Sequence, residues 1–376
     1  MLKEKILMRE QNRDSSIEIF RIITMICIIA HHYVVNSGIL EEITRENIMS
    51  LNTLFSLVFG WGGKTGINCF VLITGYFMCK LNISIKKFLK LFLEIEFYNI
   101  ILSLAFIVSG YDSFSWSGFI KTIVPVYDLG TGFVSSYLVF YLFIPYLNLL
   151  IKVMEEIQHI GLILVCLFCG MLLQTFFVVS NTFSYVGWFM VLYFIASYIR
   201  LYPKRFFEDR RLCIILFVMS LLLSWGSVIF NAYIYAKWGI RIRFYRFVDT
   251  NRILAVLTAV SAFLFFKNLH LKHCPIINKF AASVFGVLLI HANSDIMRKW
   301  LWQDVLRNVQ AYHSNYLLIH AFTSVIGIYV IATFIDMLRI KVLERPFFNW
   351  YDRVLDRKIN LRIQDIERLL QKVVGK

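Results

Sequence analysis

Charged residues, prolines and soluble-enzyme motifs are all scarce in this sequence. Only 17% of its 376 residues are charged, whereas soluble domains carry roughly 25%. Its five prolines and the lack of a glycine- and serine-rich run argue against a flexible linker to a second folded domain. No P-loop, Rossmann or zinc-binding pattern is present, and the seven cysteines lie mostly in or beside apolar segments, as small buried hydrophobic residues do. The sequence therefore excludes a soluble enzyme on a membrane anchor and predicts neither a metal site nor a bound cofactor.

Apolar segments are what the sequence has in abundance. Hydrophobic residues make up 59% of the chain, and a transmembrane helix needs about 17–25 mostly apolar residues. We predict an all-α, polytopic transmembrane helix bundle of about ten spans over residues 1–345, followed by a cytoplasmic, basic amphipathic tail over residues 346–376 that lies on the inner leaflet. The predicted spans are residues 17–37, 54–79, 88–109, 133–152, 160–180, 184–201, 212–235, 252–267, 279–296 and 316–339.

The distribution of Lys and Arg predicts the orientation of the bundle. If the N-terminus is cytoplasmic, the inner segments hold 27 of the 39 Lys and Arg residues and the outer loops hold 10. Cytoplasmic loops carry an excess of these residues, so both termini are predicted to lie inside the cell. This orientation places Arg21 near the cytoplasmic face and His32 in the outer half of the first span.

The first span carries charged and imidazole side chains that membrane helices usually avoid. Such groups are costly in hydrocarbon and are functional candidates by default. At about 100° per residue, the eleven steps from Arg21 to His32 come within roughly 20° of three full turns, and Glu18 lies on the same stripe. His31, one residue earlier, points about 100° away from His32. The alternative is a polar stripe that only packs helices together.

Three further segments contain candidate residues. The glycine-rich stretch of residues 60–66 predicts irregular backbone or a close approach between helices, with ordinary small-residue packing as the alternative. Lys87 and Lys90 share one helix face at the cytoplasmic border, although charges there can also serve only to set topology. His291 should reach the same depth as the histidines of the first span, and Asp295 one turn later could orient it. A histidine used only for packing is again the alternative.

The predicted outer loop between residues 237 and 252 is unusually basic for its side of the membrane. It contains Arg241, Arg243 and Arg246 and only one carboxylate, Asp249. Arginine forks suit phosphate oxygens, so this loop could contact an anionic glycan or a lipid phosphate. Non-specific attraction to lipid headgroups is the alternative.

Four motifs taken together resemble one family. They are Arg21 and His32 at R-x10-H spacing, residues 66–76 (GINCFVLITGY), residues 285–291 (FGVLLIH) and Glu344-Arg345-Pro346. The combination resembles the acyltransferase-3 family of integral membrane O-acyltransferases over nearly the whole chain. The resemblance implies a protein of the bacterial cell membrane that moves an acyl group, usually acetyl, from cytoplasmic acyl-CoA to a hydroxyl of an exported or cell-surface glycan.

The resemblance also implies roles for individual residues. The family's histidine corresponds to His32, as general base toward the hydroxyl or as transient acyl carrier. Its arginine corresponds to Arg21, which would bind the donor's phosphates while Glu18 holds it in place. The family's Arg-x-x-Arg pair, also on the donor side, is Lys87-x-x-Lys90 here, and lysine lacks the bidentate fork. The residues expected to contact the acceptor or support the site are Asn68, Thr74 (usually serine in the family), Arg241, Arg243, Arg246 and His291.

The expected partners are membrane lipid, an acyl-CoA donor and a glycan or lipid-linked glycan acceptor, without nucleic acid. Two other classes of protein stay open: a glycan or lipid transporter or flippase that uses the polar stripe as its substrate pathway, and a glycan polymerase. An acyltransferase should label glycan from acetyl-CoA in membranes, whereas a transporter should move its substrate unchanged.

Overall fold

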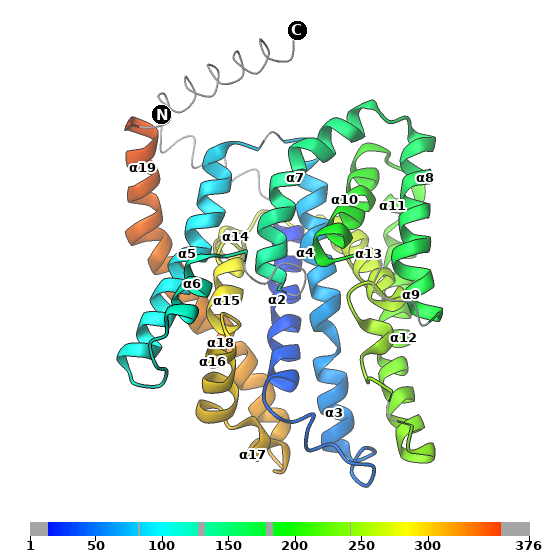
Figure 1. Cartoon of the computed structure of the whole chain (residues 1–376). Coiled ribbons are helices and arrows are strands. Elements are labelled where there is room, and N and C mark those ends of the chain that lie inside the picture. The colour runs from blue at the N-terminus through cyan, green and yellow to red at the C-terminus, as the bar shows by residue number, and fades with distance from the viewer. Residues whose placement is uncertain (1–13, 82, 127–131, 178–182, 241, 355–376) are drawn as a thin grey trace.

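The computed structural model describes residues 14–81, 83–126, 132–177, 183–240 and 242–354. Within these residues the chain forms helices joined by loops, and no strand occurs (Figure 1). The helices of the first half are α2 (Ser15–Val35), α3 (Leu51–Phe59), α4 (Gly63–Met78), α5 (Ile85–Val108), α6 (Trp116–Ile123), α7 (Phe133–Val153), α8 (Glu156–Leu167), α9 (Leu173–Phe176) and α10 (Tyr185–Leu201). Those of the second half are α11 (Arg205–Glu208), α12 (Arg210–Trp238), α13 (Ile253–Lys267), α14 (Pro275–Ala281), α15 (Val284–His291), α16 (Asp295–Lys299), α17 (Asn308–Tyr312), α18 (Leu317–Arg339) and α19 (Arg345–Val354).

Helix α2 runs through the middle of the bundle (Figure 1). It begins after Asp14, whose side chain accepts a hydrogen bond from the Ser16 amide, and it packs against α4, α13, α14, α15 and α18. Its side chains Met25, Ile29 and Tyr33 are fully buried. Because neighbouring helices surround α2, its polar side chains face other helices or internal space and not lipid.

The glycine-rich stretch brings α4 close to α2. A Cβ atom at Gly66 would lie 2.8 Å from Ile28 Cγ1, and one at Gly63 would overlap the imidazole of His31. The same stretch contains a short 3₁₀ helix, η1 (Gly60–Gly62), between α3 and α4. The glycines therefore produce both irregular backbone and close helix approach, which confirms that interpretation.

Seven helices of the described part are long and apolar enough to cross a membrane, and a bent pair raises the number to eight. The seven are Ser15–Val35, Leu51–Met78, Ile85–Val108, Phe133–Val153, Glu156–Phe176, Arg210–Trp238 and Leu317–Val354. The bent pair, Pro275–His291 and Asp295–Val305, meets at 94°. Two predicted spans coincide with shorter apolar helices, α10 with 17 residues and α13 with 15. The all-α helical bundle is confirmed, whereas the count of ten spans and the side on which the termini lie stay predictions.

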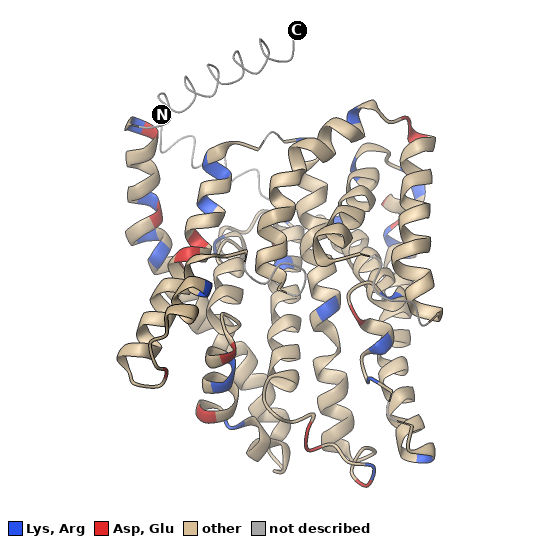
Figure 2. Ribbon diagram, viewed as in Figure 1, with Lys and Arg blue, Asp and Glu red and all other residues tan. Residues whose placement is uncertain are grey.

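The C-terminal helix extends beyond the membrane-spanning length. Leu317–Val354 has 38 residues, which is about 57 Å at 1.5 Å per residue, against a hydrocarbon core of about 30 Å. Its last part, α19, lies at the end of the bundle where α5 begins, and the ribbon in Figure 2 has Lys and Arg positions, coloured blue, on both helices. Lys86 of α5 binds Asp352 of α19 at 2.5 Å. The rest of the predicted tail, residues 355–376, lies outside the described residues.

Candidate active site

Two histidines that are far apart in the sequence meet at the centre of the candidate site. His32 lies in the last turn of α2, and His291 ends α15. His32 Nδ1 lies 3.0 Å from His291 Nε2, and the ring centroids are 5.2 Å apart. The structure thus joins, through one hydrogen bond, the two histidines that the sequence places at similar depth.

The surroundings of this pair assign the tautomer of each ring. His291 Nδ1 lies 2.6 Å from the Val287 carbonyl oxygen, and since a carbonyl can only accept, this nitrogen carries a proton. His291 is fully buried and lies in the positive field of Arg298, so the neutral ring is favoured over the imidazolium. A neutral His291 accepts the Nδ1–H of His32 through Nε2. His32 Nε2 is then the unprotonated nitrogen, and it has no hydrogen-bond partner among the described residues.

The histidine pair lies beside a break in a helix. Helix α15 ends at His291, and the next segment, Asp295–Val305, turns away by 94°. Within the break, Asn293 Nδ2 donates to the side-chain oxygen of Asn99 on α5 over 3.0 Å. Irregular backbone at membrane depth is tolerated only where protein shields it or where it lines a cavity, and such breaks often mark binding sites.

The expectation that Asp295 orients His291 is wrong. The Asp295 side chain is 95% exposed and binds Arg298 at 2.7 Å. The chain turns directly after His291, so the carboxylate that is one turn away in a continuous helix points elsewhere. The carbonyl of Val287, on the preceding turn of α15, holds the ring instead.

Arg21 and Glu18 are neighbours on α2, as their shared stripe predicts. Arg21 Nε lies 4.0 Å from Glu18 Oε2, with side-chain exposures of 30% and 7%. Neither of these two atoms makes a hydrogen bond within the described residues. Arg21 therefore keeps donors for a further anion, about 16 Å along the helix axis from His32.

Lys90 belongs to a buried group of charged side chains that we call the ion cluster. Arg339 binds three carboxylates: Glu94 at 3.0 Å, Asp336 at 2.8 Å and Glu344 at 3.0 Å. Lys90 Nζ lies 2.6 Å from Glu344 Oε1. These five residues join α5 to the C-terminal helix at the predicted cytoplasmic side. Lys90 itself is 52% exposed, so it can also contact a ligand from solvent. Lys87, one turn earlier, is half-buried, and its role in donor binding stays a prediction.

Two of the four sequence motifs pack against this ion cluster. The π-helix η5 (Ile340–Glu344) follows Arg339 and ends at Glu344. Its wider turn brings residues that are five apart in the sequence nearly onto one face. In an α-helix the same two residues would point about 140° apart. A Cβ atom at Gly286 would overlap the Asp336 carboxylate. The glycine of FGVLLIH and the glutamate of Glu-Arg-Pro are thus both explained by the geometry of this cluster.

Asn68 and Thr74 form hydrogen bonds between α4 and its neighbours. Asn68 is fully buried, donates to the Thr250 carbonyl over 2.6 Å and accepts from Trp188 Nε1 over 3.1 Å. The Thr74 hydroxyl lies 2.9 Å from the Tyr137 hydroxyl. No hydrogen bond joins either residue to the histidine pair within the described ranges. Asn68 instead fixes the segment that precedes α13, and a role for both in supporting the site stays a prediction.

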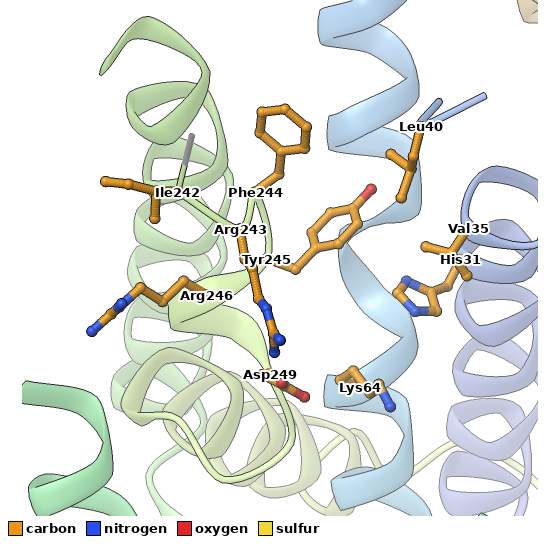
Figure 3. Close-up of a pocket in the computed structure, with 10 residues that line it drawn as sticks. All are labelled: His31, Val35, Leu40, Lys64, Ile242, Arg243, Phe244, Tyr245, Arg246 and Asp249. Carbon is orange, nitrogen blue, oxygen red and sulfur yellow. The ribbon is translucent and has the colours of Figure 1, made fainter. Parts of the chain in front are cut away.

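A cavity of about 440 Å³, which we call the outer pocket, lies between α2, α4 and the segment joining α12 to α13 (Figure 3). It is lined by His31, Val35, Leu40, Lys64, Ile242, Arg243, Phe244, Tyr245, Arg246 and Asp249. Two of the three predicted acceptor arginines, Arg243 and Arg246, therefore lie at one cavity. The third, Arg241, lies outside the described residues.

His31 faces the outer pocket and not the histidine pair. Its Nδ1 lies 2.6 Å from the Gly60 carbonyl oxygen, and its ring centroid is 6.0 Å from that of His32. The two adjacent histidines therefore point to different sides of α2, as their separation of about 100° predicts. Burial raises the pKa of Tyr245 beside His31, so this phenol stays neutral and donates to the Leu57 carbonyl over 3.2 Å.

Three charged residues of the site were not recognised from the sequence: Lys64 and two acidic members of the ion cluster, Glu94 and Asp336. Lys64 is a single cation in the second span, and its Nζ donates to the Tyr185 hydroxyl over 2.7 Å. The rule that drew attention to Arg21, that charges inside apolar spans are functional candidates, applies equally to Lys64, Glu94 and Asp336. Among the described residues, no three ligand-type side chains converge as a metal site requires.

Comparison with known proteins identifies the family to which the chain belongs. No curated protein and no solved structure matches the chain. A family model described as an acyltransferase domain matches residues 14–336, a range that includes Arg21, His32 and His291. The chain therefore belongs to the acyltransferase-3 family of membrane acyltransferases.

Proposed function

We propose that this membrane acyltransferase transfers an acyl group, in the simplest case acetyl, from cytoplasmic acyl-CoA to a hydroxyl of an exported or cell-surface glycan in the bacterial cell membrane. The observation that carries the proposal is the hydrogen-bond chain from Val287 through His291 to His32. This chain supports an unprotonated Nε2 on a ring held through its other nitrogen. A general base in acyl transfer needs both properties.

In the proposed reaction, the acceptor hydroxyl oxygen bonds to the thioester carbonyl carbon while His32 Nε2 takes the hydroxyl proton. The C–S bond then breaks, and His32 returns the proton to the CoA thiolate, which leaves as the free thiol. A general base of this kind contributes about 10²–10⁴-fold to a rate. An acyl carrier would use the same lone pair, because Nε2 would attack the carbonyl carbon and the thiol would leave before the acceptor reacts.

Arg21, Lys87 and Lys90 are proposed to bind the phosphates of the donor. The unused donors of Arg21 and the exposure of Lys90 support this role. The pantetheine arm of CoA is long enough to bridge the roughly 16 Å between Arg21 and His32 along the helix. The proposal includes ten spans with both termini in the cytoplasm, because that topology puts Arg21 on the donor side and the outer pocket on the acceptor side.

Membranes containing the protein and given radiolabelled acetyl-CoA test the proposed function. We expect label in the glycan together with free CoA thiol, and a loss of about 10²–10⁴-fold for His32→Ala at equal amounts of folded protein by size exclusion. His31→Ala changes the adjacent ring on the other side of α2. That ring lines the outer pocket and has no hydrogen bond to His291 within the described residues, so this variant should lose much less activity than His32→Ala.

Three results would separate the alternatives. Glycan that crosses the membrane without acquiring label would make the protein a transporter or flippase. An active His32→Ala protein would contradict the assignment of the base. One equivalent of thiol released without acceptor would indicate an acyl-His32 carrier, whereas thiol release that requires acceptor would indicate a general base.

A further inference from the structure

The outer pocket has an excess of positive charge. Its lining includes the cations Lys64, Arg243 and Arg246 and one carboxylate, Asp249, which gives three positive charges against one negative. Within the described part of the chain, none of the three cations forms an ion pair, and the Asp249 carboxylate accepts a hydrogen bond of 2.8 Å from the Thr250 amide. The protein itself therefore leaves a net charge of +2 at this cavity.

A fourth cation lies next to the pocket without a partner. Arg252 precedes α13, and its Nη1 atom is buried and has no hydrogen bond among the described residues. Arg243, Arg246 and Asp249 all act electrostatically on Arg252, and arginine is protonated at neutral pH. The Arg252 side chain is only partly buried, but a buried donor atom without a hydrogen bond is costly, so this Nη1 atom is expected where a ligand supplies an acceptor.

The side chains are placed so that an anion can lie between two elements. In Figure 3 the Arg243 side chain extends toward Asp249, Lys64 and His31 come from the facing helices, and the Arg246 side chain extends away from them. Arg243 and Lys64 are therefore central to the pocket, and Arg246 is peripheral. Arginine and lysine together suit a phosphate or carboxylate, the first as a fork and the second as a point charge.

The pocket also lies beside the histidine pair. His31 lines it, and the rings of His31 and His32 are 6.0 Å apart. Lys64 acts electrostatically on both rings. A volume of about 440 Å³ lies within the usual range of roughly 300–1,000 Å³ for small-molecule sites and leaves room for more than a single inorganic anion.

We infer that the outer pocket binds an acyl acceptor that carries a phosphate or a carboxylate, held by Arg243 and Lys64 with Arg246 at the rim, so that a hydroxyl of the same acceptor reaches His32. The identity of this ligand as the acyl acceptor rests on the proposed function. The anion site itself rests on the charges and geometry of the pocket.

Binding of three sugars to the purified full-length protein in phosphatidylcholine nanodiscs tests this inference. The probes are glucose, glucose 1-phosphate and glucuronic acid, and each dissociation constant comes from the ligand-dependent shift of the thermal unfolding midpoint. We expect the two anionic sugars to bind and glucose not to bind, with weaker binding at higher ionic strength. Arg243→Gln should raise the dissociation constants by about tenfold or more, since a charge-assisted hydrogen bond is lost.

Matched variants separate the pocket from general surface charge and from misfolding. Arg246→Gln should have a smaller effect than Arg243→Gln, and Arg243→Lys, which keeps the charge, should bind with intermediate affinity. Lys237→Gln is the control, because this lysine ends α12 near the same loop with its ammonium 5.1 Å from the Trp238 ring centroid and does not line the pocket. It should leave all three dissociation constants unchanged.

Several results would overturn the inference. Glucose that binds as well as the anionic sugars would remove the need for a charged group, and an unaffected Arg243→Gln protein would place the anion elsewhere. If phosphatidylglycerol in the nanodisc raises the thermal unfolding midpoint by the same amount and abolishes the shift caused by glucose 1-phosphate, the pocket binds a lipid headgroup. Because binding is measured without turnover, a protein that binds both anions but transfers no acyl group would refute the proposed function and leave the anion site standing.

Discussion

Replacing His291 with leucine should lower the turnover number of acyl transfer while leaving the apparent affinity for the donor nearly unchanged. The substitution removes the acceptor of the 3.0 Å bond from His32 Nδ1. A buried donor left without a partner costs about 1–3 kcal/mol. His32 can avoid that cost by carrying its proton on Nε2 or by rotating, and either change removes the free lone pair. Since 1.4 kcal/mol is tenfold, we expect kcat to fall about 5- to 150-fold.

A glutamine at the same position distinguishes hydrogen bonding from packing. In His291→Gln the terminal amide oxygen can accept the His32 Nδ1–H, so most of the activity that His291→Leu loses should return. The matched control is His320→Leu on the neighbouring helix α18. His320 Nδ1 lies 2.8 Å from the Tyr33 hydroxyl, and no hydrogen bond joins it to His32, so kcat should stay at the wild-type value.

The assay is release of CoA thiol from acetyl-CoA in membranes that contain the glycan, with kcat and KM determined for each variant at equal amounts of folded protein. A His291→Leu enzyme with wild-type kcat would refute the tautomer argument, and so would a glutamine variant no more active than the leucine variant. A higher KM with unchanged kcat would mean that His291 contributes to substrate binding and not to the state of His32.

Three further predictions concern stability and topology. Arg339→Met should destabilise the protein by about 3–5 kcal/mol, because it leaves the carboxylates of the ion cluster buried without their cation; an unchanged unfolding midpoint by tryptophan fluorescence would contradict this. Gly286→Ala should destabilise by about 1–3 kcal/mol, since the new Cβ would overlap a buried aspartate of the ion cluster. Gly226→Ala, whose Cβ would meet no atom within 4 Å, should instead stabilise by about 0.4–1 kcal/mol, and equal midpoints for the two variants would show that the packing argument fails. In a cysteine-free version, a cysteine replacing Asn47 should react with an impermeant external thiol reagent and one replacing Lys204 should be protected; the opposite pattern would invert the predicted topology.

Local periodicity and composition account for the helices and for the side chains that share a face of each. The separation of His31 and His32 follows from the rotation of about 100° per residue along a helix, and the structure places their hydrogen bonds on different sides of α2. The glycines between residues 60 and 66 predict the close approach of α4 to α2 because only a residue without a side chain fits there. Family membership also follows from the sequence, since its motifs are spread along one chain in a defined order.

Contacts between helices that are distant in the sequence were decided only by the tertiary structure. His32 and His291 are 259 residues apart, and no pattern near either residue indicates which nitrogen of one ring faces which nitrogen of the other. The sequence predicts Asp295 as the partner of His291 because it lies one turn later, but a bend of 94° after His291 directs it to Arg298. Likewise, the cations of the outer pocket come from α4 and from a loop that meets it only in the folded bundle. The sequence alone determines which residues lie on a given helix face, since that depends on a fixed rotation per residue. Which faces meet depends on how all the helices pack, and that packing makes His32 one half of a hydrogen-bonded pair with a free nitrogen.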